Sequence, residues 1–328
     1  MKIAVLGSNS FSGASFVDHA LARGADVIGI SRSPEPHHAF LPYRWSDRQS
    51  AFRFHALDLN RDLDAIAALI RQERPSYVVN FAAQSMVGES WKNPDHWFMT
   101  NVVSTVRLHD QLRQFDFLDR YVHITTPEVY GSTTGFITED APFNPSTPYA
   151  VSRAAADMSL RTYHAAYGFP VVYTRAANVY GPGQQLYRII PRTILFIKLG
   201  RRLSLHGGGH SSRSFIHIAD VADATWRVML EGRLGASYHI STEDVITIRE
   251  LVERICGMMS ARFADAVEVS DERLGKDTAY MLDSRKIRSE LGWRDTIGLD
   301  EGIATCIRWI EDNFDDLRSQ PFDYIHKP

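Results

Sequence analysis

The chain has 328 residues, and its 44% of hydrophobic residues are enough for a substantial core. Its 36 basic and 39 acidic residues give a net charge of -3, which argues against a nucleic-acid surface or a polybasic membrane patch and favours a small-molecule partner. Two scattered cysteines, Cys256 and Cys306, are too few for a disulfide framework or a metal cluster. We expect both to be buried thiols in a reducing compartment.

The first residues, Met1 to Leu6, run directly into a predicted strand, without the apolar stretch and cleavage site of a secretory signal. No segment of the sequence is long and apolar enough to span a bilayer. The adjacent His37 and His38 lie in a proline-rich loop, and no histidine pair has ligand spacing on a predicted helix. We therefore expect a cytoplasmic protein with no membrane span and no metal site.

Short β-branched runs alternate with amphipathic segments along the first half of the chain, which indicates a parallel sheet wrapped by helices. This pattern predicts an α/β fold, a Rossmann-type doubly wound parallel sheet. The predicted strands are Ile3–Leu6, Val27–Ile30, Phe52–Ala56, Val78–Phe81, Tyr121–Ile124 and Val171–Thr174.

After Asn178 the rhythm changes to scattered short strands and helices. We expect residues 1–178 to form a dinucleotide-binding domain and residues 179–328 to form a smaller α/β portion that binds the substrate. Later pieces such as Phe215–Ile218 can pack back onto the sheet, so the boundary need not be a clean cut. The predicted helices of this portion include Ile189–Leu199, Ile248–Met258 and Leu299–Asn313.

The first predicted strand ends in a loop from Gly7 to Gly13, and a helix follows at once, which is the setting of a dinucleotide fingerprint. Backbone N–H groups there can face a pyrophosphate. Gly7 permits a tight turn and Gly13 permits close helix packing, while Ser10 replaces the usual middle glycine. We predict cofactor contacts at Gly7, Ser10, Phe11 and Gly13, the alternative being a strand-to-helix turn without a ligand.

The second predicted strand ends in Ser31 and Arg32, where an NAD enzyme usually has an acidic residue for the ribose 2′-hydroxyl. An arginine there favours a 2′-phosphate, so we predict NADP as the cofactor, with NAD as the alternative. In the other interpretation Arg32 is a solvated loop residue. Further cofactor contacts are expected after the third and fourth strands, at Asp58, Leu59, Ala82 and Ala83.

The segments Thr125–Gly131 and Tyr149–Arg153 place a hydroxyl, a carboxylate, a phenol and a fixed cation around one pocket. A tyrosine becomes a useful base when a neighbouring positive charge lowers its pKa, and Arg153 lies one helical turn after Tyr149. Glu128 supplies a second base. We predict Thr126, Glu128, Tyr149 and Arg153 as catalytic residues, with Tyr149 and Arg153 also contacting the cofactor.

Together these segments resemble the extended short-chain dehydrogenase/reductases, and within them the nucleotide-sugar 4,6-dehydratases, over nearly the whole chain. Segments 80–85 and 148–151, with Arg32 and Ser33, are most similar to GDP-mannose 4,6-dehydratases. Segments 188–191, 213–217, 273–275, 283–287 and 291–293 are similar to segments shared with dTDP-glucose 4,6-dehydratases and sugar epimerases.

The resemblance implies a reaction that begins with oxidation of the sugar at C4. Tyr149 would take the C4 hydroxyl proton as hydride passes to the nicotinamide, and Thr126 would hydrogen-bond the oxygen at C4. Glu128 would remove the C5 hydrogen as water leaves C6, and hydride would return to C6. The product is a 4-keto-6-deoxy sugar, with the cofactor regenerated. Asn101 matches a family asparagine near the catalytic helix.

The resemblance also implies how a nucleotide-diphosphate sugar would be held. Arginines matching family positions would grip the diphosphate, where a guanidinium can bind bidentately. Helices at 95–115 and 149–167 would form the four-helix bundle of a homodimer, and the alternative for both is ordinary packing on the sheet. The implied substrate-binding residues are Ser85, Asn178, Arg188, Arg213 and Arg273.

Two positions depart from the family pattern. Arg153 stands where most members have lysine, and arginine keeps the charge but not the hydrogen-bond geometry. Pro127 stands where the dTDP-glucose enzymes carry an acidic proton donor, so either Glu128 serves as base and acid or another group protonates the leaving hydroxyl. The alternatives are a nucleotide-sugar 4-epimerase, a uronate decarboxylase, and a catalytically idle NADP-binding interaction protein.

Overall fold

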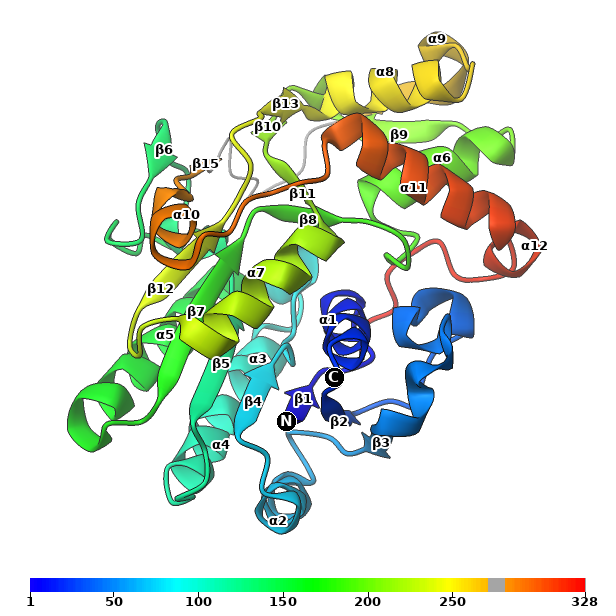
Figure 1. The fold of residues 1–328 in the computed structure, drawn as a ribbon. Helices are drawn as coiled ribbons and strands as arrows, with labels where there is room; N and C mark the ends of the chain where they lie inside the picture. The colour runs from blue at the N-terminus through cyan, green and yellow to red at the C-terminus, as the bar shows by residue number, and fades with distance from the viewer. Residues whose placement is uncertain (271–280, 328) are drawn as a thin grey trace.

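The computed structural model describes residues 1–270 and 281–327. Its centre is a seven-stranded parallel sheet with the strand order β12-β7-β5-β4-β1-β2-β3 (Figure 1). From β1 the chain adds strands outward to β3, and from β4 it adds them outward on the other side, through β5 and β7 to β12. This change in the order of strands makes the sheet doubly wound, and the predicted fold class is confirmed. The strands are β1 Lys2–Leu6, β2 Asp26–Ser31, β3 Phe52–Ala56, β4 Tyr77–Asn80, β5 Arg120–Thr125, β7 Val171–Ala176 and β12 Ser237–Ile240.

Helices cover both faces of the sheet, which explains why its central strands are apolar on both sides. One face packs against α1 (Phe11–Ala22) and α7 (Ile218–Glu231). The other face packs against α2 (Leu63–Glu73), α4 (Thr105–Leu112) and α5 (Pro148–Tyr167). Each face has its own cluster of buried aliphatic and aromatic side chains, so the sheet is the middle of three layers.

All six predicted strands exist, but the seventh strand of the sheet, β12, was not predicted. Its four residues include a serine and a histidine, so no β-branched run marks it, yet all four are buried. Phe215–His217 forms β11, which pairs with β8 (Asn178–Tyr180) in a separate two-stranded sheet and does not join the central one. The later segment that packs back onto the sheet is therefore β12, beside β7.

The later part of the chain has its own core, formed by α6 (Ile189–Lys198), α8 (Ile248–Met258), α11 (Leu299–Asp312) and α12 (Phe314–Leu317). The first three match the predicted helices, and both cysteines are buried. Because α7 and β12 belong to the layers of the sheet, the boundary at residue 178 stays a prediction. The remaining α-helices and strands of the described residues are α3 Pro94–Phe98, α9 Phe263–Ala266, α10 Arg285–Leu291, β6 Phe136–Ile137, β9 Leu203–His206, β10 Ser212–Arg213, β13 Ile246–Thr247, β14 Val267–Ser270 and β15 Met281–Leu282.

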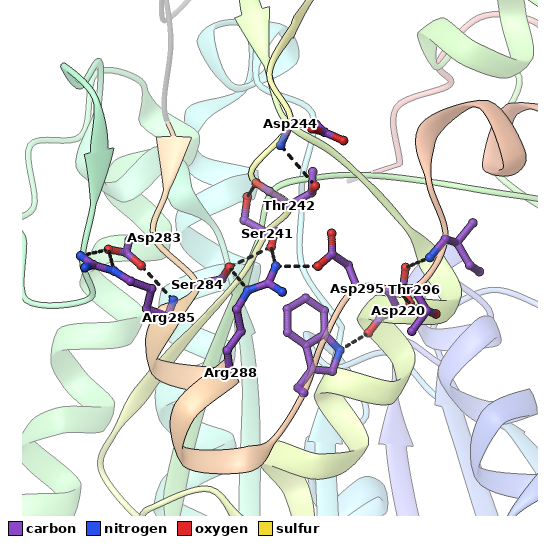
Figure 2. Close-up of polar contacts among 12 residues, drawn as sticks. Asp220, Ser241, Thr242, Asp244, Asp283, Ser284, Arg285, Arg288, Asp295 and Thr296 are labelled. Carbon is purple, nitrogen blue, oxygen red and sulfur yellow. Dashed lines mark hydrogen bonds and ion pairs between the residues drawn. The ribbon is translucent and has the colours of Figure 1, made fainter.

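Polar contacts fasten α10 and the loop after it to the sheet layers (Figure 2). Arg288 donates hydrogen bonds from Nη2 to Oδ1 of Asp295 at 2.6 Å and to the carbonyl oxygen of Ser241 at 3.0 Å, just beyond β12. The indole N–H of Trp293 donates to the carbonyl oxygen of Asp220, on α7, at 3.1 Å. These contacts join residues 288–295 to two elements of the central layers.

Candidate active site

A cleft of about 1170 Å³ opens at the carboxyl ends of β1, β4 and β5 and reaches the later part of the chain. Ligands of doubly wound folds bind at this end of the sheet. Six predicted residues do not line the cleft: Gly7, Gly13, Ser31, Asp58, Leu59 and Ala82. Arg273 lies outside the described residues. The predicted residues that line it are Ser10, Phe11, Arg32, Ala83, Ser85, Thr126, Glu128, Tyr149, Arg153, Asn178, Arg188 and Arg213.

The loop after β1 is too tightly packed for side chains at its two glycines. Gly7 has a φ of +76°, and a Cβ there would lie 2.7 Å from the backbone nitrogen of Ala82. A Cβ at Gly13 would lie 2.1 Å from the carbonyl oxygen of Gly7. Ser10 caps α1, because its Oγ accepts from the N–H of Gly13 at 3.1 Å and donates to the carbonyl of Gly7 at 2.7 Å. This compact turn before a 12-residue helix suits a pyrophosphate.

The loop after β2 is joined to the glycine loop by hydrogen bonds. Ser31 is buried, and its Oγ accepts from the N–H of Asn9 at 3.2 Å. The side-chain amide of Asn9 donates to the carbonyl oxygen of Ser33 at 2.9 Å. Arg32, between the two serines, is exposed on the cleft rim. The two loops together form a cradle where the adenosine ribose lies in Rossmann folds.

The carboxylate of Asp58 has a local role in the structure. Its Oδ1 accepts from the N–H of Asn60 at 2.8 Å, so it holds the turn that follows β3. The backbone N–H of Asp58 donates to Asp62 at 2.8 Å. The predicted contact between Asp58 and adenine stays a prediction.

The strand β5 and the helix α5 bring the predicted catalytic side chains to one wall of the cleft. Thr126 follows β5 and begins a 3₁₀ turn, where its Oγ1 accepts from the N–H of Glu128 at 3.3 Å. Thr147 caps α5 by accepting from the N–H of Ala150 at 3.1 Å, and this sets the first turn that carries Tyr149. The Thr126 hydroxyl is within hydrogen-bonding reach of the Tyr149 phenol.

Burial has the largest effect on the pKa of the Tyr149 phenol, and the residue is only 8% exposed. Burial raises the pKa of the phenol, the Arg153 guanidinium lowers it, Glu128 raises it, and the Thr126 hydroxyl lowers it. The net pKa lies above that of an ordinary tyrosine. The guanidinium therefore acts in the predicted direction, but the expectation of a net lowering is wrong because burial outweighs that charge.

Arg153 is a fixed cation, 3% exposed, and it donates a hydrogen bond to the carbonyl oxygen of Ile124 at the end of β5. This bond orients the guanidinium one helical turn beyond Tyr149, on the same wall of the cleft. Arginine at this position thus binds backbone as well as facing the site.

A buried amide connects the loop after β4 to the catalytic helix. Asn101 donates from Nδ2 to Oγ of Ser152 at 2.9 Å and to the carbonyl of Gln84 at 3.0 Å, and it accepts from the N–H of Gln84 at 2.9 Å. Asn101 lies in a π-helical segment, Met99–Ser104, which divides the helix predicted over 95–115. Segments of this kind are frequent at functional sites.

Sequence reasoning missed several residues at the cleft. Gln84 follows the small pair Ala82 and Ala83, and its position at a strand end is the signal that could have found it. Asp323 and Tyr324 line the cleft from the far end of the chain. The alternation of aromatic and other residues over 322–326 was the available signal, but no strand or helix pattern marked it.

Two predicted absences concern metals and membranes. Within the described residues, His37, His38 and Asp316 place one ligand atom each within 4.8 Å of the others. The Nδ1 atom of His37 accepts from the N–H of Ala39 at 3.3 Å, so the proton of the neutral ring lies on Nε2, which faces Asp316 at 3.9 Å. The absence of a metal site stays a prediction. No described helix combines the length and the apolar character needed to cross a membrane.

The chain is similar to known proteins along most of its length. The family model "GDP-mannose 4,6 dehydratase" matches residues 5–306. The dTDP-glucose 4,6-dehydratase of Mycobacterium tuberculosis is 32% identical, with 95% of this chain and 94% of that protein covered. The corresponding protein of Xanthomonas campestris is 30% identical, with 93% and 92% covered.

Solved structures of dTDP-glucose 4,6-dehydratases are also similar to this chain. The dTDP-glucose 4,6-dehydratase of Streptomyces venezuelae with NAD and TYD bound has a TM-score of 0.89 and 33% identity, covering 96% of this chain and 98% of that one. The dTDP-glucose 4,6-dehydratase of Bacillus anthracis in complex with NAD has a TM-score of 0.87 and 28% identity, with the same two coverages.

The doubly wound sheet, the glycine loop and the cleft with Tyr149 and Arg153 define a class of Rossmann-type enzymes that use a nicotinamide cofactor. The chain belongs to the nucleotide-sugar 4,6-dehydratase family of the extended short-chain dehydrogenase/reductases. The predictions of this family, of an enzyme and of 4,6-dehydratase function are confirmed. The predicted cytoplasmic location is untested and stays a prediction.

Proposed function

We propose that the protein converts a nucleoside-diphosphate hexose to its 4-keto-6-deoxy form, with NADP preferred over NAD. The observation that carries the proposal is the shared position of Thr126, Glu128 and Tyr149 on one wall of the cleft. A phenol and a carboxylate that face the same space can act on adjacent carbons of one sugar ring. A 4-epimerase needs no base at C5, so Glu128 favours the dehydratase.

Tyr149 takes the proton of the C4 hydroxyl, and Thr126 hydrogen-bonds the oxygen at C4. Arg153 stabilises the phenolate, since it lowers the pKa of Tyr149 against the effect of burial. When bound, the dinucleotide supplies the hydride acceptor for C4 and the hydride donor for C6. The residues that would hold it are the glycine loop, Arg32 and Arg153, because the compact turn at Gly7 and Gly13 leads directly into α1, whose N-terminal N–H groups can face a pyrophosphate.

Glu128 removes the C5 proton once C4 is a ketone, because the ketone makes that hydrogen acidic. Pro127 has neither an acidic proton nor a backbone N–H to donate. We therefore assign Glu128 both steps, removal of the C5 proton and its delivery to the hydroxyl that leaves C6. A proton from solvent then reaches C5 as the hydride returns to C6. Its partial burial and its position beside the cap residue Thr126 support this role.

The substrate diphosphate is proposed to bind between Arg188 and Arg213. Both line the cleft, and both come from segments that follow Tyr149 in the sequence. Guanidinium groups bind phosphate oxygens in pairs, which gives both affinity and orientation. Ser85 and Asn178 line the same cleft and complete the proposed set.

The preference for NADP is proposed from the loop after β2. The solved relatives were crystallised with NAD, so a nicotinamide dinucleotide is supported and the 2′-phosphate is our inference. The loop contains Arg32 where an acidic residue would favour NAD. The nearest following acid, Glu35, is held by Arg44 at 2.7 Å.

A homodimer through α3 and α5 is also proposed. Large apolar side chains are exposed on these helices and on the π-helical segment between α3 and α4, and an interface would remove them from water. Pairing with a second copy would cover them. They are Phe98, Met99, Val151, Met158 and Tyr167.

The reaction is tested by incubating the purified protein with GDP-mannose or dTDP-glucose in heavy water, with NADP or NAD added. A product that has lost water and carries deuterium at C5 supports the proposal. Inverted configuration without a change of composition would indicate a 4-epimerase, and loss of carbon dioxide from a uronate would indicate a decarboxylase. Bound dinucleotide without any turnover would indicate a binding protein.

A further inference from the structure

The C-terminal strap, residues 321–327, contains neither helix nor strand, and its residues alternate between exposed and half-buried. Its first half rests on the later part of the chain. The ring of Phe322 meets the ring of Phe196 edge-on at 6.0 Å, and Tyr324 meets Tyr187 edge-on at 5.5 Å. Because Tyr324 also lines the cleft, the strap crosses its mouth.

The second half of the strap rests on the dinucleotide-binding part of the chain (Figure 1). The ring of His326 stacks on His96 and on Trp97, each at 5.1 Å, and its Nε2 lies 2.8 Å from Nδ1 of His96. Gln84, which is 2% exposed, donates from Nε2 to the carbonyl oxygen of Lys327 at 2.7 Å. A buried side chain therefore fixes the backbone position of Lys327.

The ammonium of Lys327 lies at the end of β2. It donates a hydrogen bond to Oγ of Ser33 at 3.2 Å, and the carbonyl of Ser33 is held in turn by Asn9. Arg32 immediately precedes Ser33 and lines the same cleft as Tyr324 of the strap. Two cations and a hydroxyl thus meet beside the glycine loop.

We propose that Lys327, together with Arg32 and Ser33, forms the subsite for the 2′-phosphate of NADP. The inference rests on the NADP preference of the proposed function and adds a residue from the opposite end of the chain. An exposed guanidinium alone binds weakly because water screens it. A second cation held at a fixed place, with a hydroxyl beside it, makes charge-assisted hydrogen bonds to a phosphate dianion. A neutral 2′-hydroxyl gains much less from the ammonium.

The test measures the dissociation constants of NADP and NAD by isothermal titration calorimetry. For Lys327→Met we expect about tenfold weaker NADP binding and less than about a twofold change for NAD, the size of one lost charge-assisted hydrogen bond. Lys327→Arg should keep the preference for NADP. Lys198→Met is the matched control, because Lys198 pairs with Glu311 on α11, and both constants should stay at wild-type values.

The ratio of the two constants separates the subsite from general damage to the strap. A Lys327→Met variant with an unchanged ratio, or with equal weakening of both dinucleotides, would overturn the proposal. A wild-type protein that binds NAD more tightly than NADP would also overturn the proposed subsite. If such a protein dehydrated a nucleotide sugar with NAD, the proposed reaction would still stand. Conversely, a selective loss of NADP binding supports the subsite even where no nucleotide sugar turns over.

Discussion

Nη2 of Arg175 donates a hydrogen bond to Oδ2 of Asp157 at 2.7 Å, and neither side chain is exposed to solvent. Arg175 lies on β7 and Asp157 on α5, the helix that carries Tyr149 and Arg153. The hydroxyl of Thr125, at the end of β5, donates to the same carboxylate oxygen at 3.0 Å. This buried pair therefore ties two strands and the helix together directly behind the catalytic wall.

Replacing Arg175 with methionine should destabilise the protein by about 3–5 kcal/mol, because it leaves a carboxylate buried without its cation. Urea unfolding followed by circular dichroism measures the loss. Arg53→Met is the matched control, since Arg53 pairs with Asp26 and Glu73 at the surface. That control should cost less than about 1 kcal/mol.

A double variant distinguishes a lost charge partner from lost packing. Asp157→Leu combined with Arg175→Met leaves no charge unpaired and should recover much of the stability that Arg175→Met loses. An equally unstable double variant would show that packing around Arg175, and not the ion pair, is responsible.

Glu128→Gln should strongly slow water elimination while leaving oxidation at C4 in place, because an amide is a much weaker acceptor for the C5 proton than a carboxylate. We expect about a 10²- to 10⁴-fold lower rate of dehydration. Reduced nicotinamide should accumulate and be visible by its absorbance, with no deuterium entering C5. Glu243→Gln, at an exposed position, serves as the control and should keep full turnover. Undiminished dehydration in Glu128→Gln would reassign the second base.

The pH dependence of the first oxidation should report Tyr149. Burial raises the pKa of the phenol and Arg153 lowers it, so the rate should rise with pH as the base form appears. Arg153→Met removes the favourable charge and should move this rise to higher pH, whereas Arg153→Lys should move it less. Stopped-flow measurement of nicotinamide reduction over a pH series is the test. Superimposable profiles for the Met variant and the wild type would exclude this role for Arg153.

Acid should destabilise the protein through its buried histidines. Burial lowers the pKa of His109 to about 4, and an unfolded histidine titrates near 6.5. Because the unfolded state binds the proton more readily, the contribution is complete above about pH 6.5 and falls by about 1.4 kcal/mol per pH unit from there down to about pH 4, where the folded histidine is protonated too. Urea unfolding at several pH values should show a flatter slope for His109→Gln. An unchanged slope would mean that His109 does not carry this dependence.

Local patterns in the sequence were sufficient for most of the central sheet. Runs such as Val78–Phe81 and Val171–Thr174 are apolar because both faces of their strands are covered, and this makes them visible without a structure. The strand β12 lacks such a run, since it contains Ser237 and His239, and its burial arises from packing beside β7. The helix predicted over 95–115 is helical over 94–112, but residues 99–104 within it are π-helical, which sequence periodicity does not reveal.

By itself the sequence determined the chemistry that each short segment can offer: a glycine loop before a helix, a tyrosine with a cation one turn later, and a glutamate after a strand. Only the tertiary structure decided that burial outweighs Arg153 at the Tyr149 phenol, that Asp157 and Arg175 pair behind the site, and that Lys327 reaches Ser33. The physical reason is that periodicity and capping act over a few residues. Burial and charge pairing act between residues that only the packed chain brings together.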